Sequence, residues 1–248
     1  MRLRRHPTGP VEIREKHPLA IRWFHWVNFP VLFIMIWSGL MILWANNVFQ
    51  IGGRHVISQE SLDFPLAWYD KLIGHKPAAD DHYTLGARLA EGMSWHFLVM
   101  WIFTINGALY VLYLAFSGAW RDLLPKPGSI RHALLTVLHD LHLRKEAPPA
   151  DGYNGAQRFA YTGVIIMGFG SLISGLAIYK PMQLSGLAQF LGGYSAARFE
   201  HFWLMIGFCA FFLVHVVQVA KTGWNNFRSM ITGKELVPVE VVETEVAA

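Results

Sequence analysis

Four long runs of apolar residues dominate the chain, and polar segments separate them. The runs cover residues 20–45, 94–117, 159–180 and 200–222. A helix needs about 20 apolar residues to cross the hydrocarbon core of a bilayer, so each run predicts one transmembrane helix. We find no internal repeat. The expected fold is all-α, a four-transmembrane-helix bundle that forms a single domain over residues 1–248.

Composition supports a lipid environment. Hydrophobic residues make up 53% of the chain and charged residues only 15%, whereas soluble domains carry about 25% charged residues. The ten Trp residues suit the membrane interface. The first 22 residues are polar and basic, so we expect no cleaved leader and an uncleaved anchor in the first span.

Lysine and arginine are distributed unevenly between the two sides. Six lie in the N-terminal segment up to Arg22, six in the 118–158 connection and three in the tail from Lys221, against four in the 46–93 loop and two in the 180–199 turn. The positive-inside rule then predicts that both termini are cytoplasmic, with a long periplasmic loop between spans one and two. The expected location is the bacterial inner membrane. Because topology accounts for the net charge of +4, we expect no nucleic-acid partner.

Histidines inside the spans are the strongest chemical signal. The spans hold His25, His96, His201 and His215, and the other eight histidines fall in tails and loops. An ionisable residue inside a span indicates function, although a single histidine at a span's end is more often an interfacial hydrogen-bonding group. The predicted helix directions place His25 and His215 near the cytoplasmic face, and His96 and His201 near the outer face.

The spacing in the fourth span supports this arrangement. His201 and His215 are 14 residues apart, about 21 Å and nearly four full helical turns, so they lie on one side of the helix at two depths. Pairing His96 with His201 and His25 with His215 gives two sites, each with two axial ligands for a haem iron. The single Cys209 excludes a CxxCH attachment and a cysteine-ligated iron–sulfur cluster. The pattern therefore predicts two non-covalent b-type haems.

The third span offers no such ligand but is rich in small residues. They are Gly163, Gly168, Gly170, Ser171, Ser174 and Gly175. Small residues commonly allow close helix packing in membranes, and they also leave room for flat porphyrin faces. Both interpretations stay open.

Several short motifs occur in the order of a known family. They are Arg22-Trp23-Phe24-His25-Trp26, Ser38-Gly39-Leu40, His96, Tyr153-Asn154-x-x-Gln157-Arg158, and His201 with His215. Over residues 18–235 the chain resembles the bacterial cytochrome b561 and nickel–iron hydrogenase b-type cytochrome superfamily, which includes the formate dehydrogenase gamma subunit. The branch it most resembles is the thiosulfate-reductase-type cytochrome b subunit.

The resemblance implies two b haems that exchange electrons with membrane quinone. In the formate dehydrogenase branch the quinone site lies by the inner haem, beside the Asn-x-x-Gln-Lys/Arg segment, which nominates Asn154, Gln157 and His215 here. Asn154 also stands where a helix N-cap would. Position alone nominates three cations for the haem propionates: Arg22, Arg198 and Lys221.

Two connections between spans carry further hypotheses. The 46–93 loop holds Trp68, Tyr69 and acidic residues, and we expect it either to dock a periplasmic redox partner or to shield the outer haem. Residues 130–142 have the apolar spacing of a helix on the membrane surface. His132, His139 and His142 within this segment indicate either a metal site or, more simply, a solvated face.

The preferred function is that of an electron-transfer subunit. It would carry electrons across the bilayer between the quinone pool and a periplasmic oxidoreductase of the molybdopterin or hydrogenase type. One alternative is a free-standing quinone oxidoreductase without a fixed partner. A non-redox membrane anchor or metal transporter is the other, although the spans contain almost no carboxylates for a transport path.

Overall fold

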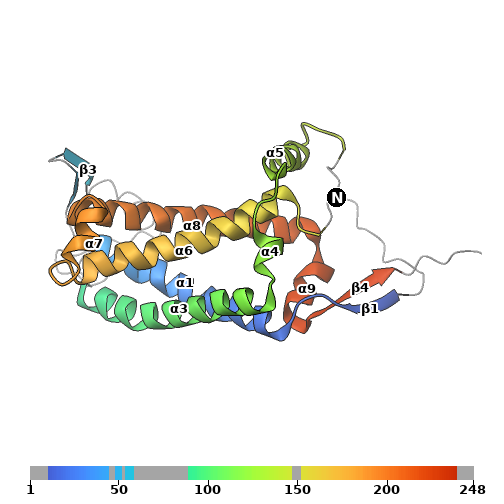
Figure 1. Ribbon diagram of the computed structural model, residues 1–248, viewed down its shortest axis with the longest axis horizontal. Coiled ribbons are helices and arrows are strands. Elements are labelled where there is room, and N and C mark those ends of the chain that lie inside the picture. Colours follow the sequence, from blue (N-terminus) through green and yellow to red (C-terminus); the bar gives the residue numbers. More distant parts are fainter. Residues whose placement is uncertain (1–10, 45–47, 52–53, 59–88, 147–151, 239–248) are drawn as a thin grey trace, which may run out of the picture. The chain divides into compact units, whose positions relative to one another are not determined.

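Four helices are long and apolar enough to cross a membrane. The computed structural model describes residues 11–44, 48–51, 54–58, 89–146 and 152–238 (Figure 1). The long helices are α1 (Leu19–Trp44), α3 (Leu89–Ser117), α6 (Gly155–Tyr179) and α8 (Tyr194–Thr222). The predicted four spans are therefore confirmed.

Short elements connect or flank the long helices. The helices are α4 (Trp120–Leu123), α5 (Ser129–Asp140), α7 (Ser185–Phe190) and α9 (Trp224–Thr232). Strand β1 (Val11–Glu15) pairs antiparallel with β4 (Lys234–Pro238), and β2 (Val48–Ile51) pairs antiparallel with β3 (Arg54–Ser58). The fold is mostly helical, as expected, with little sheet in the described residues.

The predicted starts of three spans were too late. Helix α3 begins at Leu89, α6 at Gly155 and α8 at Tyr194, before the apolar runs that mark them in the sequence. The first turns of these helices carry polar residues such as Glu91 and Gln157. Such turns lie at the interface, where polar side chains remain hydrated, so a hydropathy pattern leaves them out.

The helix surfaces are apolar where they are exposed. On α3, Leu98, Trp101 and Ile105 are each more than half exposed. A soluble protein rarely leaves so much contiguous apolar surface uncovered. Lipid is the solvent that suits these faces.

By contacts, the chain forms two compact units. One combines the residues up to Trp26 with those from Leu213 onward, and the other spans Val27–Phe212. In the first unit β1 and β4 lie side by side (Figure 1), and the amides of Lys16 and His17 donate to the carbonyl oxygen of Gly233. We call β1, β4 and α9 with these contacts the terminal clasp.

Side chains from α1 extend the terminal clasp. The guanidinium of Arg22 donates to the carbonyl oxygen of Ile231 at 2.6 Å, and the indole N–H of Trp26 donates to that of Met230 at 3.0 Å. Gly233 has φ +83°, and a Cβ there would lie 3.0 Å from the backbone oxygen of His17. The clasp therefore needs glycine at its corner, and it fastens the start of α1 to α9.

In the second unit, a buried arginine organises the connection between α3 and α6. Arg158 is 6% exposed, and it donates to the carbonyl oxygens of Tyr153, Asp122 and Leu124. Three backbone acceptors satisfy a cation that would otherwise be costly to bury. This arginine therefore fixes the turns on both sides of α4 against the start of α6.

Helix α5 lies across the first turn of α6 (Figure 1). A Cβ on Gly155 would collide with the carbonyl oxygen of Ser129 and the amide nitrogen of Ala133. Glycine therefore permits the close approach of the two helices. Ile130 and Leu134 on α5 are exposed, which agrees with the expected amphipathic helix.

The long helices reveal a repeat that the sequence reading missed. Helices α3 and α8 both have 29 residues, and His96 and His201 are each the eighth residue. In α1 and α6, Ser38 and Ser174 are each the twentieth residue, and both are followed by Gly-Leu. Aligned in this way, the hairpin α1–α3 corresponds to the hairpin α6–α8.

Further positions match in the same alignment. Arg22 and Arg158 are both the fourth residue of their helices. Arg22 donates to a backbone carbonyl of α9, which follows α8, and Arg158 donates to a backbone carbonyl of α4, which follows α3, so each contacts the segment after the last helix of the other hairpin. At two matched positions the residue types differ. His25 of α1 matches Tyr161 of α6, and His215 of α8 matches Tyr110 of α3. The two hairpins share a framework but differ in chemistry at these positions.

Candidate functional site

Four histidines of the spans lie in two facing pairs. The ring centroids of His96 on α3 and His201 on α8 are 6.2 Å apart, with an interplanar angle of 70°. Those of His25 on α1 and His215 on α8 are 6.0 Å apart, with an angle of 56°. The structure brings together the same residues that the sequence pattern paired.

This spacing fits an ion held between two imidazoles. A metal–imidazole bond of about 2 Å on each side places the two ring centroids about 6 Å apart. Each pair fits two axial ligands of one iron, and neither supplies a third protein ligand: among the described residues no group of three or more His, Cys, Asp or Glu side chains forms a metal site. The metal site considered for His132, His139 and His142 is therefore wrong, because these side chains do not converge.

A serine contacts each ring of the first pair. The Nδ1 atom of His96 lies 3.0 Å from Oγ of Ser38, and that of His201 lies 3.0 Å from Oγ of Ser174. A glycine follows each serine, and a Cβ on Gly39 or Gly175 would lie 3.4 Å or 3.3 Å from Cε1 of the corresponding ring. The histidines are thus held against α1 and α6 by the same two-residue arrangement.

The second pair has a different surrounding. Nδ1 of His25 is buried and has no hydrogen-bond partner within the described chain, and the same is true of Nε of Arg22. The ring of Trp26 packs edge-on against His25, with centroids 5.0 Å apart. Buried polar atoms of native proteins are usually satisfied. These two atoms therefore fit a site that a polar, partly anionic group such as a haem with its propionates completes.

The other cations nominated for propionates lie on α8. The guanidinium carbon of Arg198 is 5.7 Å from the ring centroid of Tyr194, one turn before it. Lys221 is exposed in the last turn of α8.

Asn154 and Gln157 form a capping box at the start of α6. The Asn154 side chain accepts from the amide of Gln157 at 2.9 Å, and the Gln157 side chain accepts from the amide of Asn154 at 3.0 Å. The N-cap interpretation is therefore confirmed. The capping box uses the side-chain oxygens of Asn154 and Gln157 as acceptors and leaves their NH₂ groups as donors.

Three tyrosines gather near this capping box. Tyr153 packs edge-on against Tyr161 with ring centroids 5.1 Å apart, and Tyr110 of α3 lies within electrostatic reach of both. Burial, aided by the nearby carboxylate of Asp122, raises the pKa of Tyr153. Its phenol is therefore protonated at neutral pH and remains a hydrogen-bond donor.

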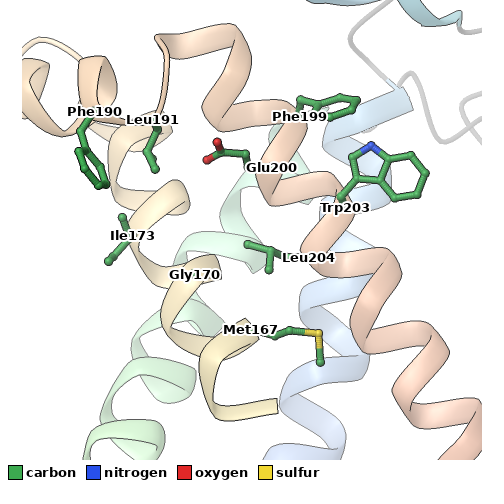
Figure 2. Close-up of a pocket in the computed structure, with 9 residues that line it drawn as sticks. All are labelled: Met167, Gly170, Ile173, Phe190, Leu191, Phe199, Glu200, Trp203 and Leu204. Atoms are coloured by element: carbon green, nitrogen blue, oxygen red, sulfur yellow. The ribbon is translucent and has the colours of Figure 1, made fainter. Parts of the chain in front are cut away.

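A groove of about 530 Å³ opens between α6 and α8 (Figure 2). Its lining is almost wholly apolar and includes Met167, Gly170, Ile173, Phe190, Leu191, Phe199, Trp203 and Leu204, with Glu200 as the acidic exception. Figure 2 shows Glu200, the neighbour of His201 in the chain, at the α7 end of the groove, with Met167 deeper along α6. Gly170, one of the small residues of the third span, lines the groove, but none of the predicted haem, quinone or propionate residues does.

Sequence reasoning missed Ser38 and Ser174 as neighbours of the histidines. The small residues of the third span were read as packing or porphyrin space, yet Ser174 and Gly175 contact His201 directly. The available signal was the tripeptide Ser-Gly-Leu, which occurs in both the first and third spans. The loop residues Trp68, Tyr69, Asp63, Asp70, Asp80 and Asp81, expected to dock a partner, lie outside the described residues.

Comparison with known proteins identifies the family. The family model described as prokaryotic cytochrome b561 matches residues 16–233. A relative from Azospira oryzae, named "Putative protein-methionine-sulfoxide reductase subunit YedZ1", is 31% identical over 210 residues, which cover 84% of this chain and 92% of the relative. No solved structure matches the chain. The chain belongs to the prokaryotic cytochrome b561 family, and it is a multi-pass protein of the bacterial inner membrane that binds haem b and carries electrons.

Proposed function

We propose that the chain is a di-haem electron-transfer subunit that links the membrane quinone pool to a periplasmic oxidoreductase. The observation that carries the proposal is the presence of two facing histidine pairs. His96 and His201 would hold the haem near the periplasm, and His25 and His215 would hold the haem near the cytoplasm. This assignment uses the orientation predicted from the basic residues.

The protein's own contribution is to bind and position. Haem b, when bound, supplies an iron that takes up and releases one electron. His96 with His201, and His25 with His215, would each offer two imidazoles to the iron of a bound haem, which would leave substrate no coordination position. In the bilayer the apolar helices would keep water away from both sites, and Arg22, with its partnerless Nε, provides a cation one turn before His25. These features favour electron transfer over chemistry on a bound substrate.

A quinone site fits best beside the capping box of α6. The NH₂ groups of Asn154 and Gln157 and the protonated phenol of Tyr153 are three donors at one helix start. A quinone headgroup needs donors at its oxygens and a route for protons to one aqueous phase. By the predicted orientation this helix start faces the cytoplasm, which would supply that route.

For the partner, the relative's name gives a specific candidate. That protein is called a subunit of a protein-methionine-sulfoxide reductase, and we propose a periplasmic reductase of this class in preference to the thiosulfate, hydrogenase or other molybdopterin types. Reducing a sulfoxide to a thioether and water takes two electrons and two protons. Oxidation of one quinol releases two of each, so electrons would flow from quinol to the periplasm.

The test uses the full chain in native membranes. A tagged chain should co-purify with a periplasmic reductase, and a water-soluble quinol should reduce the b-type absorption in the complex. Addition of the oxidised substrate should then restore the oxidised spectrum. Isolation of the chain without an oxidoreductase, with normal reduction by quinol, would instead support the free-standing quinone oxidoreductase. Failure of quinol to reduce the purified chain would contradict both.

A further inference from the structure

The hydroxyls of Ser38 and Ser174 have a defined hydrogen-bond direction. Ser38 Oγ lies 2.6 Å from the carbonyl oxygen of Ile34, and Ser174 Oγ lies 2.7 Å from that of Gly170. A carbonyl oxygen only accepts, so each hydroxyl must give its single proton to the carbonyl one turn earlier. The serine oxygen can then only accept a hydrogen bond from the histidine.

This direction decides the tautomer of both histidines. Nδ1 of His96 and Nδ1 of His201 must each carry a proton, and the serine oxygen lies 3.0 Å away in both cases, with the backbone of Met35 or Ser171 as a second acceptor. In a neutral imidazole the other nitrogen, Nε2, then holds the lone pair. Each ring of this pair is therefore prepared to bind a metal through Nε2.

Each ring also lies close to the glycine that follows its serine. A Cβ on Gly39 or Gly175 would come within 3.4 Å of Cε1 of the histidine that its serine contacts. The serine therefore sets the rotation of the ring, and the glycine allows the ring to rest against the helix backbone. Both serines are almost completely buried, at 0% and 1% exposed, so water does not compete for these hydrogen bonds.

His25 of the second pair lacks this device. Nδ1 of His25 is buried without a hydrogen-bond partner in the described chain, and the position of Tyr161 in α6 matches His25 in the repeat. A hydrogen bond accepted from Nδ1–H makes the opposite nitrogen more basic and so stabilises the more highly charged state of a bound metal. The two haem sites should therefore differ in redox potential.

From these observations we propose that Ser38 and Ser174 are positioning residues that hold His96 and His201 in one tautomer and lower the redox potential of the haem between them. The inference rests on the proposed haem at the His96–His201 pair. It assigns a shared role to the Ser-Gly-Leu tripeptides of α1 and α6, one on each hairpin of the repeat.

Midpoint potentials of the purified, haem-loaded chain provide the test. Ser38→Ala and Ser174→Ala should each shift one haem component to higher potential, the same component in both, and the double variant should shift it further. The other component should not move. Ser94→Ala is the matched control, because Ser94 also bonds the carbonyl one turn earlier, at 2.8 Å, and lies two residues from His96.

A variant that loses haem is still informative. Ser38→Cys keeps a side chain of similar size that accepts hydrogen bonds weakly, and it should retain haem at an intermediate potential even if Ser38→Ala does not. Three results would overturn the inference. Both alanine variants could retain haem at unchanged potential, both haem components could shift equally, or the alanine and cysteine variants could all lose haem. The proposed function fails by a different result, namely normal haem content after His96→Ala.

Discussion

His25 and His215 face each other with ring centroids 6.0 Å apart, although 190 positions of the sequence separate them. The terminal clasp explains how they meet. Strands β1 and β4 join the two ends of the chain, and Arg22 and Trp26 bind the backbone of α9. The clasp thereby fixes the start of α1 against the segment that follows α8, and His25 lies one turn beyond Arg22.

Replacing Trp26 tests the clasp. Trp26→Phe removes the hydrogen bond to the Met230 carbonyl but keeps an aromatic ring against Phe227, so we expect a loss of about 0.5–1.5 kcal/mol in local stability. Hydrogen exchange of residues 229–236 should become faster. Trp101→Phe, at a 60% exposed position of α3, is the control. Equal exchange in both variants would argue against a role for this bond.

The clasp should also weaken in acid. Burial, and then the positive charge of Lys16, lower the pKa of His17, while Glu235 opposes them. The unfolded segment binds the proton more readily, so this contribution to stability is complete above the unfolded-state pKa of about 6.5. It is lost as the pH falls from there through the lower folded-state pKa.

Limited proteolysis of the clasp between pH 5 and 8 measures this effect. The wild-type chain should be cleaved faster at the lower end, and His17→Gln should flatten the dependence. An unchanged pH profile in the variant would assign the effect to another group.

Gly155 offers a test of the connection between α5 and α6. Gly155→Ala places a methyl group against the backbone of Ser129 and Ala133, and overpacking of this kind costs about 1–3 kcal/mol. Thermal unfolding in detergent should therefore occur at a lower temperature. Gly163→Ala, in the same helix but with nothing within 4 Å of its added Cβ, should not destabilise the protein. If the two variants melt alike, α5 does not pack on α6 as described.

Isosteric substitutions separate helix capping from quinone binding at Asn154. Asn154→Asp keeps the oxygen that accepts from the Gln157 amide but removes the NH₂ donor. The melting temperature should stay unchanged, while the rate of reduction by quinol should fall about tenfold, equivalent to about 1.4 kcal/mol. Asn154→Ala should lower both. A normal quinol rate in Asn154→Asp would leave Asn154 with a capping role alone.

The spans and the histidine pairs could be predicted from the sequence because they depend on the length of the apolar runs and on the alternating direction of successive helices. An apolar run of bilayer length has few alternatives to a transmembrane helix, and the helix directions alone match His96 with His201 in depth. The first residues of the helices were harder to predict. Asn154 and the first turn of α6 are polar, so hydropathy hides them, although the capping residues were visible in the sequence.

The repeat and the clasp were beyond the sequence reading for different physical reasons. Packing against lipid constrains most helix positions only to be apolar, so the two hairpins share a minority of their residues, among them Arg22 with Arg158, Ser38 with Ser174 and His96 with His201. The clasp pairs short strands from opposite ends of the chain. Nothing local in Val11–Glu15 specifies a partner as distant as Lys234–Pro238.

Haem stoichiometry tests the central claim most directly. Iron and haem b should be measured per chain in the purified wild type and in His96→Ala and His215→Ala, with His139→Ala as a control outside the spans. We predict two haems in the wild type and the control, and one in each of the other variants, with the high- and low-potential components lost separately. A wild-type chain with a single haem, or histidine variants that retain full haem content, would contradict the assignment of the two pairs.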